Sequence, residues 1–187
     1  MPLEVTLANK NDEAVVKQLL QLHLHEQCPI SHQELQDDGT FAFPGLEKYF
    51  DDPDRAAYLF RLKRRVAGFA LVRTGEGLDG TPYHTIPEIF IIETYRGWGV
   101  GEECTRTIFD RHEGRWCIAV KEIQSDAMGF WRNVIWRYSG QAFKQSKSTE
   151  FSGTVFEFTS PPPVPVVQPM ESLVDRPIVH RRRTRTI

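Results

Sequence analysis

The sequence has few cysteines and no long apolar run. Its three cysteines, Cys28, Cys104 and Cys117, are an odd number without the spacing of a disulfide framework. We therefore expect buried or free thiols in a reducing compartment. No apolar stretch approaches the roughly 20 residues that a membrane-spanning helix needs, and the first residues lack the basic start and apolar core of a signal peptide. These absences predict a cytoplasmic protein.

An excess of charge of one sign is also missing. The formal net charge is −2 at pH 7, so the whole-chain charge does not attract nucleic acid or an anionic membrane. The charge is uneven, however: residues 31–54 carry seven acidic side chains and one basic one, whereas residues 176–187 carry five arginines and no acid. The acidic stretch is either a solvated loop or a surface for a cationic molecule. The basic end either solubilises the chain or contacts RNA, anionic lipid or the acidic stretch itself.

The composition is that of one globular domain with an appended segment. Hydrophobic residues make up 40% and charged residues 26% of the 187 positions, which is enough for a real core. No internal repeat is visible. After Ser160 the prolines at 161–163, 165, 169 and 177 disfavour both helix and strand pairing. We predict a domain over residues 1–160 and an extended or disordered tail over 161–187, first Pro-rich and then Arg-rich.

Hydrophobic periodicity predicts alternating strands and helices within the domain. The expected strands are 3–7, 57–62, 66–72, 86–92, 116–120, 142–147 and 154–158. The expected helices run from 11–12 to Cys28-Pro29, around 46–50, over 102–111, and from a Ser125-Asp126 cap to Gly140. Pro87, inside an expected strand, must lie at a bulge or a strand start. This order predicts an α/β fold with a mixed sheet.

A glycine-rich segment, Arg96-Gly97-Trp98-Gly99-Val100-Gly101, joins the strand 86–92 to the next helix. Glycine lets a backbone approach an anion closely, and the free N–H groups at a helix start hold negative charge. The segment is not a Rossmann fingerprint, because Glu102 takes the place of the last glycine, and it lacks the Gly-Lys-Ser/Thr of a Walker A loop. It matches Arg-x-x-Gly-x-Gly. Its placement predicts a phosphate cradle; the alternative is a strand-to-helix turn with incidental glycines.

This motif and the element order resemble the GNAT acetyltransferase superfamily, which binds the pyrophosphate of coenzyme A on an Arg/Gln-x-x-Gly-x-Gly/Ala loop. The likeness spans residues 3–158. It also extends to a less specific block at residues 124–131, and residues 45–55, 68–72 and 130–132 are similar to bacterial predicted acetyltransferases of this superfamily. The resemblance implies the GNAT, or acyl-CoA N-acyltransferase, fold: a splayed central mixed β-sheet flanked by helices. It implies acetyl-CoA as co-substrate and an amine as acetyl acceptor.

The resemblance also assigns roles to residues. The backbone of Ile91 and Ile92 would hold the pantetheine arm and polarise the thioester carbonyl. The remaining cofactor contacts would come from Arg96, Gly97, Trp98, Gly99, Val100, Gly101, Glu102, Gln124, Phe130 and Trp131, the last two of which are equally suited to core packing. Three positions depart from the family pattern. Glu102 puts a negative charge near the phosphates, although it also complements the helix start. Gln124 replaces an asparagine, and Trp131 replaces a tyrosine that protonates the leaving thiolate, which an indole cannot do near neutral pH. Tyr138, Tyr95 or water would then supply that proton, or the thiolate would leave unassisted.

Glu88 is the candidate general base, acting directly or through water. Apolar neighbours would desolvate its carboxylate and bring its pKa toward the working pH; the alternative is an ordinary surface or salt-bridged carboxylate. His84, four residues earlier, shares its strand face if the pleat is regular, and is the second candidate. Otherwise it is a loop residue.

A cluster of candidate metal ligands, His23, His25, Cys28 and His32, precedes the acidic stretch. Positions 23 and 25 point to nearly opposite sides of a helix, because each residue turns about 100°. We therefore expect no metal, and partly exposed histidines at a helix end.

The sequence leads to one main hypothesis and two alternatives. The main hypothesis is an acetyl-CoA-dependent N-acetyltransferase acting on a small-molecule or peptide amine, with a cationic acceptor as one option. A non-catalytic GNAT-like module that contacts protein or RNA is the alternative, motivated by the changes at Gln124 and Trp131. The third hypothesis is transfer of a longer acyl chain, or transfer to an acceptor that is not an amine. We expect no membrane or nucleic-acid partner, and a homodimer is left open.

Overall fold

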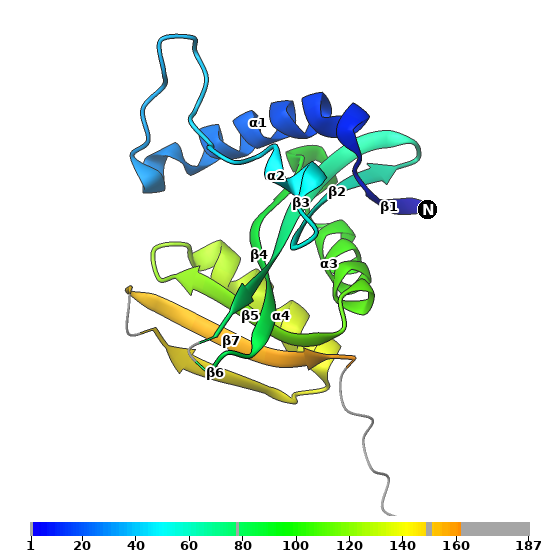
Figure 1. Cartoon of the computed structure of the whole chain (residues 1–187), viewed down its shortest axis with the longest axis vertical. Helices are drawn as coiled ribbons and strands as arrows, with labels where there is room; N and C mark the ends of the chain where they lie inside the picture. Colours follow the sequence, from blue (N-terminus) through cyan, green and yellow to red (C-terminus); the bar gives the residue numbers. More distant parts are fainter. Residues whose placement is uncertain (1, 78, 149–150, 162–187) are drawn as a thin grey trace, which may run out of the picture.

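A seven-stranded sheet forms the centre of the molecule (Figure 1). The computed structural model describes residues 2–77, 79–148 and 151–161, so the predicted tail lies, beyond residue 161, outside the described residues. The strands are β1 (Leu3–Leu7), β2 (Arg55–Leu62), β3 (Arg65–Glu76), β4 (Pro82–Ile91), β5 (Gly114–Lys121), β6 (Phe143–Lys147) and β7 (Gly153–Ser160). The helices are α1 (Glu13–Ser31), α2 (Lys48–Asp51), α3 (Val100–Arg111) and α4 (Ser125–Ser139), with short 3-10 helices η1 (Lys10–Asp12) and η2 (Glu93–Tyr95). This confirms the predicted element order and mixed α/β class.

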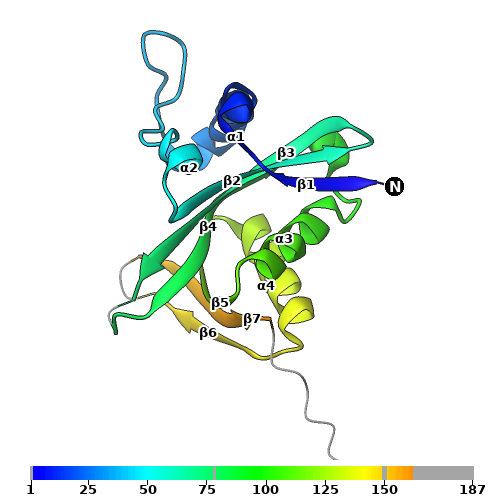
Figure 2. The same ribbon diagram turned by 45° about the vertical axis from the view of Figure 1, so that its right-hand side comes forward.

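The sheet divides into two parts between β4 and β5. The strand order is β1-β2-β3-β4-β5-β7-β6, and every neighbouring pair is antiparallel except β4 and β5. These two strands run parallel and pair at a single position, His84 with Trp116. Beyond that position they diverge (Figures 1 and 2). The predicted splayed mixed sheet is therefore confirmed.

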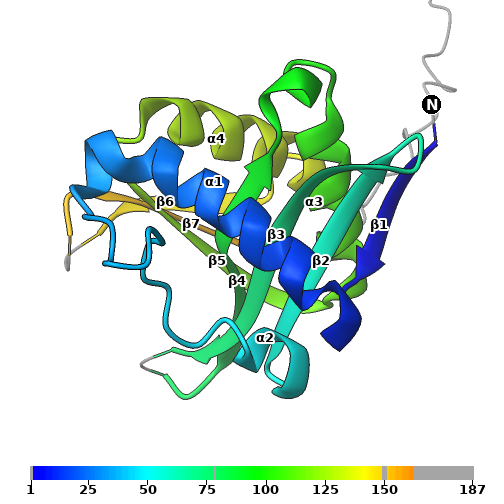
Figure 3. The same cartoon turned by 90° about the horizontal axis from the view of Figure 1, so that it is seen from above.

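Each face of the sheet has its own apolar core. Helix α1 and the short α2 cover one face, as seen from above in Figure 3, and α1 buries Val16 and Leu20 there. Helices α3 and α4 cover the other face, with Ile108 and Ile135 fully buried. Both layers bury side chains at the i, i+3, i+4 spacing of an amphipathic helix. No helix within the described ranges is both long and apolar enough to span a bilayer.

A β-bulge interrupts β4 at Pro87. Leu71 of β3 pairs with Glu88, and Arg73 pairs with Thr85. Two residues of β4 therefore lie opposite one residue of β3, which is the definition of a bulge. The prediction that Pro87 lies at such an irregularity is confirmed. A bulge suits proline, because the residue has no N–H to donate to the strand ladder.

The bulge reverses the alternation of side chains along β4. Before it, Ile86 packs in the core under α3 and α4, and His84 packs against Trp116 on the same side. After it, Phe90 packs in the core under α1, and Glu88 contacts α1. The expectation that His84 and Glu88 share a strand face is therefore wrong, since the extra residue turns the second half of the strand over.

Two helix ends differ from the predictions. Helix α1 continues past Cys28-Pro29 to Ser31 and ends at His32, whose backbone is left-handed (φ 52°) and whose N–H donates to the Cys28 carbonyl. A proline in the last turn removes one helical hydrogen bond but does not stop the chain from completing the turn. Helix α4 has Gln124 at its N-cap, and no side-chain cap is found there within the described chain. The predicted stop at Gly140 is confirmed by its left-handed φ of 59°.

Candidate active site

A cleft of about 670 Å³ opens where β4 and β5 diverge. Its walls come from the end of β4, the loop and first turn of α3, one side of α4 with the two residues before it, and the second half of α1. The volume lies in the range of small-molecule and cofactor sites. The predicted cofactor residues that line it are Ile91, Arg96, Gly97, Gly99, Val100, Gly101, Glu102, Gln124, Phe130 and Trp131. The fold thus gathers most of the predicted set around one cavity.

The loop before α3 presents bare backbone to this cleft. Gly97 and Gly99 have φ angles of 78° and 79°, a left-handed conformation that side-chain-bearing residues rarely adopt. A Cβ atom added at either position would have no heavy atom within 4 Å. Gly99 is also the N-cap of α3, and in the described part of the chain no side chain caps that helix start. The first N–H groups of α3 are therefore directed to an external acceptor, which is how helix starts bind anions.

Gly101 is small for a different reason. A Cβ atom at this position would lie 3.2 Å from Phe130 Cε2 and 3.5 Å from Ile91 Cγ1. The first turn of α3 therefore packs closely against both α4 and β4. Phe130 is half-buried and Trp131 is 6% exposed, with the two rings 5.1 Å apart in an edge-to-face arrangement. Both aromatic side chains pack against the core and line the cleft at once.

Ile91, rather than Ile92, presents its backbone to the cleft. The Ile92 N–H donates to the Ala67 carbonyl at 2.9 Å, and the Ile92 carbonyl accepts from the Tyr95 N–H at 2.8 Å. Neighbouring residues of a strand point their N–H groups in opposite directions, so the Ile91 N–H points away from β3. Its carbonyl accepts from Arg96 Nε at 2.7 Å on that side. The structure does not leave the Ile92 backbone available for the predicted cofactor contact.

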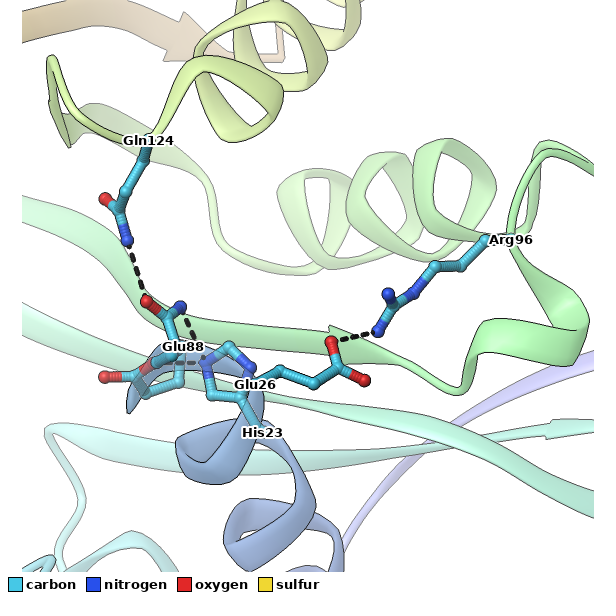
Figure 4. A network of polar contacts seen from close by, with 6 residues as sticks. His23, Glu26, Glu88, Arg96 and Gln124 are labelled. Atoms are coloured by element: carbon cyan, nitrogen blue, oxygen red, sulfur yellow. Dashed lines mark hydrogen bonds and ion pairs between the residues drawn. The ribbon is translucent and has the colours of Figure 1, made fainter. Parts of the chain in front are cut away.

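The two arginines that line the cleft both form ion pairs. Arg96 Nη2 lies 2.6 Å from Glu26 Oε2, and both side chains are 44% exposed (Figure 4). Arg137 Nη1 lies 2.6 Å from Glu102 Oε2, with exposures of 56% and 24%. Arg137 was not among the predicted residues; its position on α4, two turns after Phe130, is the signal that points it to the same cavity. Any anion in the cradle would meet arginines that are already paired with carboxylates.

Gln124 connects two walls of the cleft. Its Nε2 donates to Gln27 Oε1 of α1 at 3.1 Å, so the start of α4 is held to the opposite helix. The amide keeps the hydrogen-bonding capacity of the asparagine that the family pattern has at this position.

Glu88 is engaged by a histidine of α1. His23 Nε2 and Glu88 Oε2 are 2.7 Å apart (Figure 4), with the His23 side chain 9% and the Glu88 side chain 24% exposed. The Glu88 carboxylate is therefore hydrogen-bonded to a side chain of another element rather than free at the surface. His23 lines the cleft and Glu88 does not. The expectation of a partly exposed His23 is wrong, because the residue continues the apolar stripe of Leu19 and Leu20 at helical spacing.

His84 and Tyr138, the other catalytic candidates, lie away from the cleft. His84 Nδ1 is 3.2 Å from Thr74 Oγ1, and its Nε2 is 3.1 Å from the Glu113 carbonyl. The Tyr138 hydroxyl donates to Asp110 at 2.7 Å. Burial raises the pKa of Tyr138 to about 12, so this phenol gives up its proton less readily than a free tyrosine. The fold does not bring either residue to the cleft.

The remaining candidates lie outside the cavity. Trp98 is 65% exposed on the outer side of the loop. Tyr95 packs partly buried against the core under α3 and α4. No group of three or more histidine, cysteine, aspartate or glutamate side chains suited to a metal is found among the described residues.

Comparison with known proteins rests on structure, because neither a protein-family model nor a curated protein matches this sequence. An acetyltransferase from Thermus thermophilus has a TM-score of 0.59 at 18% identity, covering 85% of this chain and 97% of the other. A GNAT-family acetyltransferase from Staphylococcus aureus has a TM-score of 0.58 at 12% identity, covering 83% and 98%. An Arabidopsis thaliana protein in complex with the bisubstrate analogue CoA-Ac-MVNAL has a TM-score of 0.56 at 12% identity, covering 85% and 99%. At these identities the likeness establishes the fold: this chain has the GNAT fold, as its glycine motif indicated.

Proposed function

We propose that this protein is an acetyltransferase that takes the acetyl group of acetyl-CoA and transfers it to an amine. One observation carries the proposal: the unpaired edge of β4 and the uncapped start of α3 face the same cleft. An extended, amide-containing ligand with a phosphate group at one end fits these two features together. The structural neighbours, among them the protein in complex with a CoA-containing analogue, support this proposal.

The residues of the cleft suit the parts of acetyl-CoA. The N–H groups at the start of α3 and the open backbone at Gly97 and Gly99 would hold the diphosphate. The Ile91 N–H, on the free edge of β4, would hydrogen-bond the arm or the thioester oxygen. When bound, acetyl-CoA supplies the activated acyl carbonyl. A backbone donor aimed at the oxygen on which negative charge develops stabilises the transition state by several kcal/mol.

The acceptor side is acidic. Glu26 and Asp126 line the cleft, and the segment between α1 and α2 carries most of the acidic residues of the stretch 31–54. Amines are cations at neutral pH, so this charge would concentrate them near the cleft. We infer an amine acceptor that carries further positive charge, such as a polyamine, an aminoglycoside or a basic peptide. The amine must lose a proton to react, and His23, which lines the cleft and contacts Glu88, is one side chain placed to take part.

Calorimetric titration with acetyl-CoA, free CoA and ATP tests the cofactor part of the proposal. We expect acetyl-CoA and CoA to bind and ATP to bind much more weakly, because ATP has phosphates but no pantetheine arm for the β4 edge. Thiol release in the presence of spermidine, an aminoglycoside and a basic peptide would then identify the acceptor class. An absence of acetyl-CoA binding would refute the proposal and favour a non-catalytic interaction module.

A further inference from the structure

Helix α1 contacts three separate walls of the cleft through one of its faces. The three side chains are spaced i, i+3 and i+4, so they point the same way. The contacts are His23 with Glu88 of β4, Glu26 with Arg96 of the loop, and Gln27 with Gln124 at the start of α4. Figure 4 shows the His23 ring between the side chains of Glu88 and Glu26. This helix therefore belongs to the site as much as β4 does.

The His23 ring is fixed in position by its surroundings. Its centroid lies 6.1 Å from the Phe69 ring, edge to face, and 5.5 Å from the Phe90 ring. Only 7% of the residue is exposed. Together with the 2.7 Å contact to Glu88, these rings determine which nitrogen faces the carboxylate. That nitrogen is Nε2.

The contact also determines where the lone pair of the ring lies. Nε2 has two neighbours: the amide nitrogen of Gln27, which can only donate, at 3.5 Å, and the carboxylate of Glu88, which accepts, at 2.7 Å. The contact to Glu88 is much the shorter, so Nε2 carries the hydrogen and donates it to Glu88. In the neutral ring Nδ1 then has the free lone pair. No hydrogen-bond partner for Nδ1 is found among residues 2–77, 79–148 and 151–161. In these residues the one fully buried side-chain polar atom without a partner is Ser139 Oγ, so Nδ1 is not fully buried. Nδ1 is therefore accessible, on a residue that lines the cleft.

Glu88 lies behind this histidine. It is absent from the residues that line the cleft, whereas His23 is among them. The carboxylate is thus placed to orient the ring and to stabilise its protonated form, as the buried carboxylate does in a Ser-His-Asp triad. The other charged or titratable groups near the pair are Glu26 on the same helix, which is bonded to Arg96, and Tyr49 of α2. Arg55 of β2 and Arg73 of β3 interact electrostatically with Tyr49, and the groups of β3 and β4 in contact with the His23 ring itself are Phe69 and Phe90.

We propose that His23, and not Glu88, is the residue that takes the proton from the amine, with Glu88 as its positioning residue. This inference rests on the proposed acetyltransferase function. The amine first loses one proton to solvent, and the neutral nitrogen attacks the thioester carbonyl carbon; a C–N bond forms, and the C–S bond breaks with its electron pair on sulfur. The proton that the nitrogen loses goes to His23 Nδ1. The resulting imidazolium keeps its Nε2–H bond to Glu88 and later returns the proton to solvent or to the thiolate.

Kinetics of three variants test the assignment. His23→Gln should lower turnover about 100-fold or more, while calorimetry shows acetyl-CoA affinity within about twofold of wild type. The inflection in the pH–rate profile should disappear in His23→Gln and persist in Glu88→Gln, which should lose less activity. His25→Gln is the matched control, because His25 lies exposed on the same helix against Phe41. We expect this variant to behave as wild type.

The opposite pattern would overturn the inference: an inflection lost in Glu88→Gln and kept in His23→Gln makes Glu88 the base. A wild type that binds no acetyl-CoA would instead refute the proposed function itself, so the two failures are distinguishable. Nitrogen-15 NMR of the histidine rings adds a test that needs no acceptor. The signal missing in His23→Gln should show a protonated Nε2 and a bare Nδ1. The reverse tautomer would refute the geometry on which the inference stands.

Discussion

The substitution Gly99→Ala tests two properties of the loop separately: its left-handed backbone and the open space that it leaves for a ligand. Gly99 has a φ of 79° and no neighbour within 4 Å of an added Cβ atom. The methyl group therefore meets no clash, and the cost is that of a left-handed backbone, about 1–2 kcal/mol. For a domain of this size 1 kcal/mol corresponds to roughly 2–4 °C in melting temperature, so we expect a decrease of about 2–8 °C.

The same variant should bind acetyl-CoA poorly. A methyl group at Gly99 occupies the open space of the phosphate cradle. When the strained backbone at this residue relaxes, the nearby N–H groups also turn away from the phosphate. Loss of one charge-assisted hydrogen bond, worth about 1.5–3 kcal/mol, corresponds to a decrease in affinity of roughly 10- to 100-fold. Differential scanning fluorimetry measures the first effect and isothermal titration calorimetry the second.

Gly39→Ala is the matched control for this prediction. Gly39 has a φ of 77°, also with no heavy atom within 4 Å of an added Cβ, and it lies in the loop between α1 and α2, outside the residues that line the cleft. The Gly39→Ala variant should show the same decrease in melting temperature, and its affinity for acetyl-CoA should be unchanged. If Gly99→Ala binds as tightly as Gly39→Ala, the loop is not the phosphate cradle, and the reasoning from its backbone geometry fails.

Four further predictions concern groups around the cleft and in the core. In Glu26→Gln, Arg96 no longer has to give up an exposed ion pair, worth about 0.2–1 kcal/mol, before it binds the phosphates. We therefore expect this variant to bind acetyl-CoA about 1.5- to 5-fold more tightly. Weaker binding in calorimetry would show that Glu26 itself holds the cofactor. Tyr138→Phe should lower the free energy of unfolding in urea by about 0.5–1.5 kcal/mol and leave turnover within about twofold, whereas a large rate loss would restore the phenol as an acid. Since burial raises the pKa of Tyr138 from its ordinary value of 10.0 to about 12, wild-type stability should fall as pH rises from 10 to 12, where the unfolded phenol ionises before the folded one; a flat profile, like that expected of Tyr138→Phe, would contradict this. Burial likewise raises the pKa of the Cys104 thiol to about 12, so a disulfide reagent should modify Cys104 only on unfolding, and rapid reaction in the native state would contradict its buried position.

The local features of the fold could be predicted because they depend on residues close together in the chain. Alternating and helical spacing of apolar residues located every strand and helix to within a few positions. The glycines of the 96–101 segment predicted a strand–loop–helix connection, and the left-handed angles at Gly97 and Gly99 show why glycine is needed there. Pro87 predicted a bulge or a strand start, because a residue without an N–H cannot complete a strand ladder, and the structure has the bulge.

The consequences of the bulge could not be predicted from the sequence. An irregularity at Pro87 was foreseen, but its reversal of the strand faces depends on how many residues of β4 oppose β3. His84 and Glu88 were therefore predicted to share a strand face, whereas they lie on opposite sides of the sheet. Likewise, the resemblance gave Ile91 and Ile92 equal roles, whereas hydrogen bonds to Ala67 and Tyr95 leave only Ile91 free.

By itself the sequence determined the order of the elements and the loop that faces the cleft, since both follow from local spacing and backbone freedom, whereas the splayed mixed sheet was implied by the family resemblance of the glycine motif. Only the tertiary structure decided what surrounds that loop. His23 and Glu88 are 65 residues apart, and Glu26 and Arg96 are 70 apart, so no periodicity links them. They meet because the apolar face of α1 packs on the sheet beside the diverging strands, and that packing places a histidine where the sequence suggested a glutamate.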